Sequence, residues 1–152
     1  MRGGEAVEAA LRIERELDVF AARRAVRDAA DAIGFGRRAR EELAIVVSEL
    51  ATNILKYGVR GEIRLESIDD AGRGRGLRIT ACDVGPPIED FATALVDGCA
   101  ARGPIAPDEL AGRRGIGGGL GAVQRLSDSL EYLPDEHGKR IRAVRFLVGK
   151  RR

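Results

Sequence analysis

Two side chains that could take part in catalysis, Glu49 and Asn53, lie four residues apart in a segment whose apolar residues recur at helical spacing. Residues at this spacing project from the same side of a helix, so a carboxylate and an amide would point together. Both fall roughly a quarter turn from the centre of the apolar stripe, and Lys56 continues the same line. There they could orient a water or hydroxyl and a metal ion. On spacing alone, a solvated helix edge is the simpler explanation.

A second candidate group follows directly after an apolar, strand-like segment from Leu77 to Cys82. The next residues are Asp83, Val84 and Gly85, followed by two prolines. A carboxylate at a strand end can accept a hydrogen bond from an N–H group of a ligand, and a glycine lets a ligand approach the backbone. Aspartate, glycine and proline also favour turns. Taken alone, these residues indicate a ligand contact and a plain turn equally well.

The third candidate is a glycine-rich run from Gly115 to Gly121, which leads into a helical segment beginning at Leu120. Backbone N–H groups in such a loop, together with a helix N-terminus, can bind phosphate oxygens. A Walker A loop is excluded because no Gly-Lys-Ser/Thr follows, and a dinucleotide fingerprint because a turn-rich stretch precedes the run in place of a strand. A flexible linker is the alternative, but five glycines beside a helix favour phosphate binding.

The residue pattern between these groups predicts the elements that must position them. Alternating apolar residues indicate strands, and apolar residues three and four apart indicate helices. The expected elements are a strand near 10–16, helices over 18–33 and 38–56, strands over 62–68 and 77–82, a short helix over 88–96, a helix over 120–128, and strands over 129–133 and 140–148. Helices grouped against a largely antiparallel sheet predict a two-layer α+β architecture, without the regular alternation of a Rossmann fold.

Glycines and one aspartate predict where the helices begin and end. Asp18 is the expected N-cap of the first helix, and Gly34-Phe35-Gly36 is expected to close it and turn the chain. Gly58 lies just past the second helix, where a left-handed cap residue is common. The glycine-containing connector over 69–76 predicts a hairpin loop, and the stretch over 98–114 is too irregular for a core element.

Composition places the chain among globular domains. At 152 residues it is long enough for one domain with a real core, and 44% hydrophobic and 33% charged residues fit a soluble protein. The net charge of +2 and interspersed signs argue against a nucleic-acid binder, so the basic runs at 37–40 and 150–152 are interpreted as solvated surface. Cys82 and Cys99 lack metal-site spacing, and Cys82 is expected to be a small buried thiol. Without an apolar leader over 1–8 or an 18-residue apolar window, a cytoplasmic protein without membrane contact is expected.

The three candidate groups, taken together and in this order, resemble the N, G1 and G2 boxes of the GHKL ATPases. The resemblance implies one domain over 1–152 with the Bergerat-type two-layer fold, in which helices cover one face of a mixed, mostly antiparallel sheet, and a flexible ATP lid over about 98–118. The chain is too short for gyrase, Hsp90 or a histidine kinase. It is similar instead to the small serine kinases that act as anti-sigma factors and partner switches, and within them to the RsbT-like switch kinases of the stressosome. The similarity runs from Asp18 to Leu147.

The resemblance also implies a role for each matching position. Glu49 would be the general base that takes the proton from an attacking serine hydroxyl. Asn53 would ligate Mg²⁺, which bridges the ATP phosphates, and Asp83 would bind the adenine amino group. The remaining nucleotide-binding positions implied are Lys56, Gly85, Gly115, Gly117, Gly119 and Leu120, with Arg125, Arg113 and Arg114 as further candidates for phosphate contacts.

The implied activity is ATP- and Mg²⁺-dependent phosphoryl transfer to a serine or threonine of a STAS-domain antagonist protein, dominated by positioning and charge neutralisation. In this family the same chain can also bind a sigma factor or a PP2C-type phosphatase, and a homodimer is one state that it could adopt. A metabolic ATPase has little support, because no substrate-pocket motif is present in the sequence.

Three departures from the family pattern are present, and those at Pro87 and Lys139 favour an alternative. Pro87 stands where the G1 box usually has a second glycine, and proline removes an N–H and fixes φ. Gly138-Lys139 replaces the usual Gly-Thr, which loses a hydroxyl at the adenine end. The segment over 103–114 is longer than the lid of the similar kinases. The alternative is a non-catalytic, nucleotide-responsive binding module that controls a sigma factor or phosphatase, whereas the intact Glu49–Asn53 pair favours the kinase.

Overall fold

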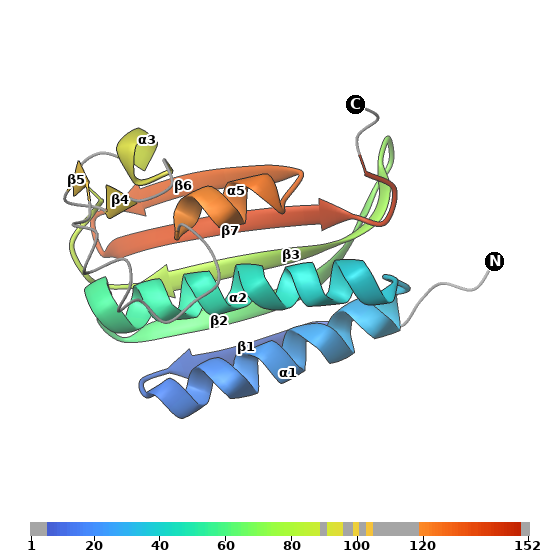
Figure 1. Ribbon diagram of the computed structural model, residues 1–152, viewed down its shortest axis with the longest axis horizontal. Coiled ribbons are helices and arrows are strands. Elements are labelled where there is room, and N and C mark those ends of the chain that lie inside the picture. Colours follow the sequence, from blue (N-terminus) through green and yellow to red (C-terminus); the bar gives the residue numbers. More distant parts are fainter. Residues whose placement is uncertain (1–5, 89–90, 96–98, 101–102, 105–118, 150–152) are drawn as a thin grey trace.

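Alternating apolar and charged residues form the main sheet of the computed structural model, and two long helices pack beside it (Figure 1). The structure describes residues 6–88, 91–95, 99–100, 103–104 and 119–149. Its elements, in chain order, are β1 Glu8–Ile13, α1 Glu16–Ile33, α2 Arg37–Tyr57, β2 Gly61–Asp70, β3 Gly74–Asp83, α3 Phe91–Ala94, β4 Cys99–Ala100, β5 Gly103–Pro104, α5 Leu120–Arg125, β6 Ser129–Asp135 and β7 Gly138–Phe146.

The main sheet has the strand order β1-β2-β3-β7-β6, and each neighbouring pair of strands is antiparallel. Two hairpins, β2-β3 and β6-β7, meet in the centre, where β3 pairs with β7 and Asp83 lies opposite Lys139. β4 and β5 form a separate two-stranded ribbon. The predicted α+β class is confirmed. The sheet was expected to be mixed and mostly antiparallel, and every described pair of strands in it is antiparallel.

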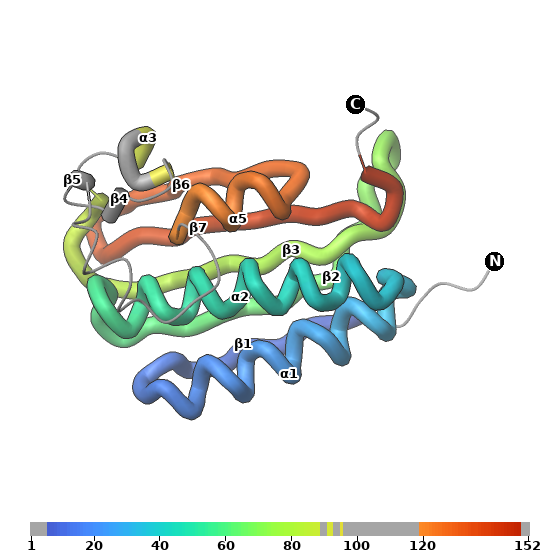
Figure 2. Tube along the Cα trace, viewed as in Figure 1, coloured from blue at the N-terminus to red at the C-terminus, as the bar shows by residue number. Residues whose placement is uncertain are grey.

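Among the described residues, the helices α1, α2 and α5 lie on the same face of the sheet, as Figures 1 and 2 show. Strand residues that face the helices are apolar, and their neighbours along the strand point away. Ile63 and Leu65 of β2 are 0% exposed, whereas Arg64 between them is exposed. Burying a side chain of this kind contributes about 1.5–3 kcal/mol. This alternation decides which face of the sheet the helices cover, and the predicted two-layer arrangement is confirmed.

Helix α1 begins two residues before the start of the range expected from the sequence. Arg15 is its N-cap, so the prediction of Asp18 as the N-cap is wrong. The Asp18 carboxylate instead reaches back from the third helical position and accepts the backbone N–H groups of Glu14 and Arg15 at 2.8 and 2.9 Å. These hydrogen bonds lower the pKa of Asp18. At the other end Gly34 adopts a left-handed φ of 116°, which confirms the predicted helix stop.

Helix α2 ends at Tyr57, and the prediction of a left-handed cap at Gly58 is wrong. Gly58 has an extended backbone with φ of −96° and ψ of 170°, and its N–H still donates to the carbonyl of Ile54 at 2.8 Å. A Cβ atom on Gly58 would lie 3.0 Å from Cγ of Asp83. The same Cβ would lie 2.9 Å from the carbonyl oxygen of Ile54, so glycine is needed because α2 and the end of β3 both pack closely against this position.

Strand pairing extends further than local composition suggested. The connector expected over 69–76 is reduced to a turn over 71–73, because the ladder continues to the pair Asp70 and Gly74. The Asp70 carboxylate closes this turn by accepting the N–H groups of Gly72 and Arg73 at 2.8 and 2.9 Å. β6 and β7 likewise extend to a tight turn at 136–137. β1 begins and ends earlier than expected, at Glu8–Ile13.

The short helices are shorter than expected. The helix predicted over 88–96 is Phe91–Ala94 within the described residues, and the one predicted over 120–128 is Leu120–Arg125. Of the stretch over 98–114, only β4 and β5 are described, so the predicted ATP lid lies mostly outside the described residues. No described helix has both the length and the apolar character needed to cross a lipid bilayer.

Candidate functional site

Asp83, the last residue of β3, forms a buried ion pair with Lys139 of β7. The lysine Nζ lies 2.7 Å from Oδ1 of Asp83, and the side chains are 2% and 6% exposed for Lys139 and Asp83 respectively. Lys139 also donates to the backbone carbonyl of Pro86 at 2.8 Å. Oδ1 of Asp83 accepts a further hydrogen bond from the N–H of Gly85 at 2.7 Å. The carboxylate, the lysine and the turn after β3 therefore form one connected polar cluster.

Three glycines surround this aspartate closely. A Cβ on Gly85 would lie 2.9 Å from Oδ1 of Asp83, and a Cβ on Gly58 would lie 3.0 Å from its Cγ. A Cβ on Gly138 would collide with the carbonyl oxygen of Asp83, and Gly138 has a φ of 155°. Packing against Asp83 and against the backbone of Tyr57 and Val59 accounts for glycine at 85. Close approach of a ligand to this backbone, as expected from the sequence, stays a prediction.

The turn after Asp83 is anchored to the edge strand β6. Pro87 is exposed and Ile88 is 7% exposed. The N–H of Ile88 donates to the hydroxyl of Tyr132 at 2.8 Å, and the Tyr132 ring stacks on Phe91 with centroids 4.7 Å apart. Pro87 has no N–H to donate, and the N–H of the next residue, Ile88, holds the turn in place.

Glu49 lies on the buried side of α2 and not at a solvated edge. Its residue is 7% exposed, in a helix whose neighbouring apolar residues Val46 and Leu50 are 0% exposed. Asn53, one turn further on, is half-buried, and Lys56 is exposed. Buried glutamates are rare in proteins and cluster at functional sites. The simpler explanation, a solvated helix edge, therefore fails for Glu49, whereas it fits Lys56.

The two predicted halves of the site meet along α2. Asp83 packs against Gly58 at the C-terminal end of this helix, and Asn53 and Glu49 lie roughly one and two turns before that end. Helix α5 packs beside α2 (Figure 2). The structure therefore places the Asp83 turn at the end of the helix that carries Glu49 and Asn53, and nucleotide binding by these residues stays a prediction.

The glycine-rich run is described only at its end. Gly119 has a left-handed φ of 66° as the N-cap of α5, and Leu120 is 5% exposed. Gly115 and Gly117 lie outside the described residues, as do Arg113 and Arg114, so phosphate binding by this loop stays a prediction. Arg125 is exposed in the last turn of α5, at the opposite end of the helix from Gly119.

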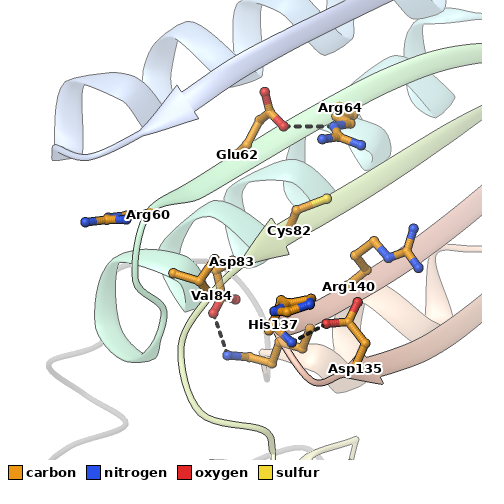
Figure 3. Close-up of a pocket in the computed structure, with 11 residues that line it drawn as sticks. Arg60, Glu62, Arg64, Cys82, Asp83, Val84, Asp135, His137 and Arg140 are labelled. Carbon is orange, nitrogen blue, oxygen red and sulfur yellow. Dashed lines mark hydrogen bonds and ion pairs between the residues drawn. The ribbon is translucent and has the colours of Figure 1, made fainter.

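A pocket of about 430 Å³ opens beside the ends of β2, β3 and β7, and Asp83 and Lys139 are among the residues that line it. Figure 3 shows Arg64, Cys82 and Arg140 on three adjacent strands within it, with the Arg64–Glu62 ion pair at 2.8 Å. Cys82 is half-buried and free, and burial raises the pKa of its thiol. A protonated thiol is a poor nucleophile and metal ligand. Cys82 was expected to be a small buried thiol, but it is half-buried and lines this pocket.

Mg²⁺ is the metal implied by the resemblance, and the donors present fit it. Asn53 offers an amide oxygen at a half-buried position on α2. Mg²⁺ commonly keeps several waters and takes substrate phosphates with one or two protein ligands. Among the described residues no group of three His, Cys, Asp or Glu side chains could hold a metal ion. A nucleotide-bound Mg²⁺ does not require such a group.

Lys139 and Tyr132 are the site residues that reasoning from the sequence missed as structural partners. Lys139 appeared only as the replacement of a hydroxyl. It is in phase with Ile141 and Ala143, both buried on the helix-facing side of β7. A lysine in the buried phase of a strand normally needs a partner of opposite charge. The position of Lys139 in the buried phase of β7 was therefore the sequence signal that could have identified its ion pair.

Comparison with known proteins agrees with this geometry. The family model of the histidine kinase-like ATPase domain matches residues 14–145, a range that includes Glu49, Asn53, Asp83 and Lys139. The serine/threonine-protein kinase RsbT of Bacillus subtilis (strain 168) is 36% identical over 142 residues. The aligned part covers 92% of this chain and 97% of RsbT.

Proposed function

The chain belongs to the histidine kinase-like ATPase family, and from this premise we propose that it is an ATP- and Mg²⁺-dependent protein serine/threonine kinase. The observation that carries the proposal is the buried Glu49, one turn before Asn53 on a helix whose end packs against Asp83. Similarity over 92% of the chain to a protein named as a serine/threonine kinase supports it.

In this proposal the nucleotide lies along α2. Asp83 binds the adenine amino group at the C-terminal end of the helix, and Asn53 ligates the Mg²⁺ that accompanies the phosphates. The glycines that precede α5 bind the phosphate oxygens through backbone N–H groups. Phosphoryl transfer of this kind is catalysed mainly by positioning and by neutralisation of charge.

Glu49 acts on the attacking hydroxyl. The oxygen of a serine or threonine side chain forms a bond to the γ-phosphorus, and the bond from that phosphorus to the β–γ bridging oxygen breaks. The hydroxyl proton passes to the Glu49 carboxylate, and ADP leaves. A base in this role must lie within hydrogen-bond reach of the hydroxyl, which the substrate protein brings to the site.

We propose a STAS-domain antagonist protein as the substrate, in a partner-switching module of the anti-sigma or stressosome type. A sigma factor or a PP2C-type phosphatase is the proposed downstream partner. One observation favours the second candidate, a non-catalytic binding module. Lys139 already forms an ion pair with the carboxylate assigned to adenine, at 2.7 Å.

The test is a transfer assay with the STAS protein encoded beside this chain, Mg²⁺ and γ-labelled ATP. We expect Glu49→Gln to reduce the rate about 10²- to 10⁴-fold, the usual contribution of a general base. Glu41→Gln on the exposed side of the same helix is the matched control and should retain the rate. Undiminished transfer by Glu49→Gln would remove the base assignment. Absence of ATP binding by calorimetry in the wild type would leave a binding module that uses only the fold to control its partner.

A further inference from the structure

We propose that Lys139 reads the nucleotide base together with Asp83, supplying the hydrogen-bond donor that faces the N1 position of adenine. This inference rests on the proposed function, because it takes the Asp83 cluster as the base end of the nucleotide site. It starts from the hydrogen bonds that the cluster leaves unmade.

The ammonium of Lys139 has one donor to spare. A lysine ammonium carries three N–H donors. Within the described residues two of them are used, by Oδ1 of Asp83 at 2.7 Å and by the carbonyl of Pro86 at 2.8 Å. The side chain is 2% exposed, so bulk water has little access to it. The third N–H has no acceptor among the described residues, so an acceptor on a bound ligand would complete the set of three.

The carboxylate has one oxygen to spare. Both hydrogen bonds that Asp83 accepts from described residues, from Lys139 and from Gly85, end on Oδ1. Oδ2 accepts none within the described part of the chain. The cluster therefore presents an acceptor beside a donor. Adenine presents the complementary pair along its Watson–Crick edge, a 6-amino donor beside the N1 acceptor.

The charges also favour a base over a charged group at this point. Lys139 and Asp83 neutralise each other, so the cluster carries no net charge to attract a phosphate or repel a neutral ring. A purely structural ion pair would gain little over apolar packing, since buried pairs are often neutral or destabilising relative to hydrophobic residues. A lysine in place of the hydroxyl therefore keeps a donor at the base end of the site, in a charged and stronger form.

The test compares ATP with 1-deaza-ATP, which lacks the N1 acceptor and keeps the 6-amino group. We expect the wild-type chain to bind 1-deaza-ATP about 10- to 100-fold more weakly than ATP, the range for a hydrogen bond to a charged group. In Lys139→Met, which retains length but has no donor, the ratio of the two dissociation constants should fall close to one. The double variant Asp83→Asn/Lys139→Met removes both charges and serves where the single variant does not fold.

The outcomes separate this inference from the proposed function. No binding of ATP by the wild type would overturn both. Binding of ATP with equal affinity for 1-deaza-ATP would overturn the role of Lys139 and leave the kinase proposal standing. A preference for ATP that persists in Lys139→Met or in the double variant would also overturn it, because another donor would then face N1.

Discussion

Arg145 of β7 reaches across the helix-facing side of the sheet to Glu42 of α2, with Nη1 and Oε2 2.9 Å apart. The same nitrogen donates to the backbone carbonyl of Leu126 just after α5, at 3.1 Å. One guanidinium thus connects the sheet to both helices that flank the candidate site. Burial acts to raise the pKa of Glu42, but the hydrogen bond and charge of Arg145, with those of Arg38, lower it overall.

Glu42→Gln should therefore destabilise the protein and make its free energy of unfolding depend less on pH in the acid range. Because the folded-state pKa of Glu42 is lowered, its contribution is present above the unfolded value of about 4.3 and is lost as the pH falls through the folded value. We expect a loss of about 1–3 kcal/mol at pH 7, measured by urea unfolding, and a smaller difference between variant and wild type at pH 3. An equal difference at both pH values would contradict the assigned role of the ion pair.

Cys82 should react slowly with alkylating reagents in the folded protein. Burial raises the pKa of its thiol, so less thiolate is present at pH 7 than in an exposed cysteine. In a Cys99→Ser background, we expect iodoacetamide to modify Cys82 more slowly in the folded chain than in the same chain unfolded in urea. In the folded chain the rate of modification should still be rising above pH about 8.5. A folded chain that reacts as fast as the unfolded one would show an exposed, activated thiol.

Local periodicity was sufficient to predict the strands of the main sheet and the helices that cover it, because each of these shows its own apolar phase, whereas β4 and β5 were not predicted. The same phase placed Glu49 and Asn53 together on α2. It could not decide between cap positions, since an acid is favourable both at the N-cap and within the first turn. Asp18 was misassigned for this reason. Gly58 was misassigned because its neighbour across space, Asp83, is invisible to a local pattern.

The polar cluster itself depends on strand register. Asp83 and Lys139 are opposite each other only because β3 pairs with β7 across 56 positions of sequence. No local signal determines that pairing, which follows from how the two hairpins join at the centre of the sheet. The departure from Gly-Thr was readable in the sequence, but the partner that the lysine takes was not.

Gly85→Ala should weaken the turn that holds Asp83. A Cβ there would lie 2.9 Å from Oδ1 of Asp83, 3.1 Å from the backbone nitrogen of Val59 and 3.2 Å from the carbonyl oxygen of Tyr57. Two of these atoms belong to the backbone and cannot simply rotate away. We expect a loss of about 1–3 kcal/mol in unfolding free energy. Gly149→Ala, which meets nothing within 4 Å, is the control and should be near neutral.

The Asp83–Lys139 pair should show strong energetic coupling in a double-mutant cycle. Each single variant, Asp83→Asn or Lys139→Met, leaves a charge buried without its partner, which typically costs about 3–5 kcal/mol. The double variant removes both charges and retains an amide oxygen for the N–H of Gly85. We expect its loss of stability to be smaller than the sum of the two single losses.

The measurement is urea unfolding of all four chains without nucleotide, because a bound ligand would itself add stability. Residues in direct contact usually show interaction energies of about 0.5–3 kcal/mol, whereas independent sites add to within roughly 0.5 kcal/mol. Additive losses would mean that the two charges do not stabilise each other in the folded protein. In that case the ion pair would not hold the ammonium of Lys139 in place. A role of Lys139 in nucleotide binding would then depend on the comparison of ATP with 1-deaza-ATP alone.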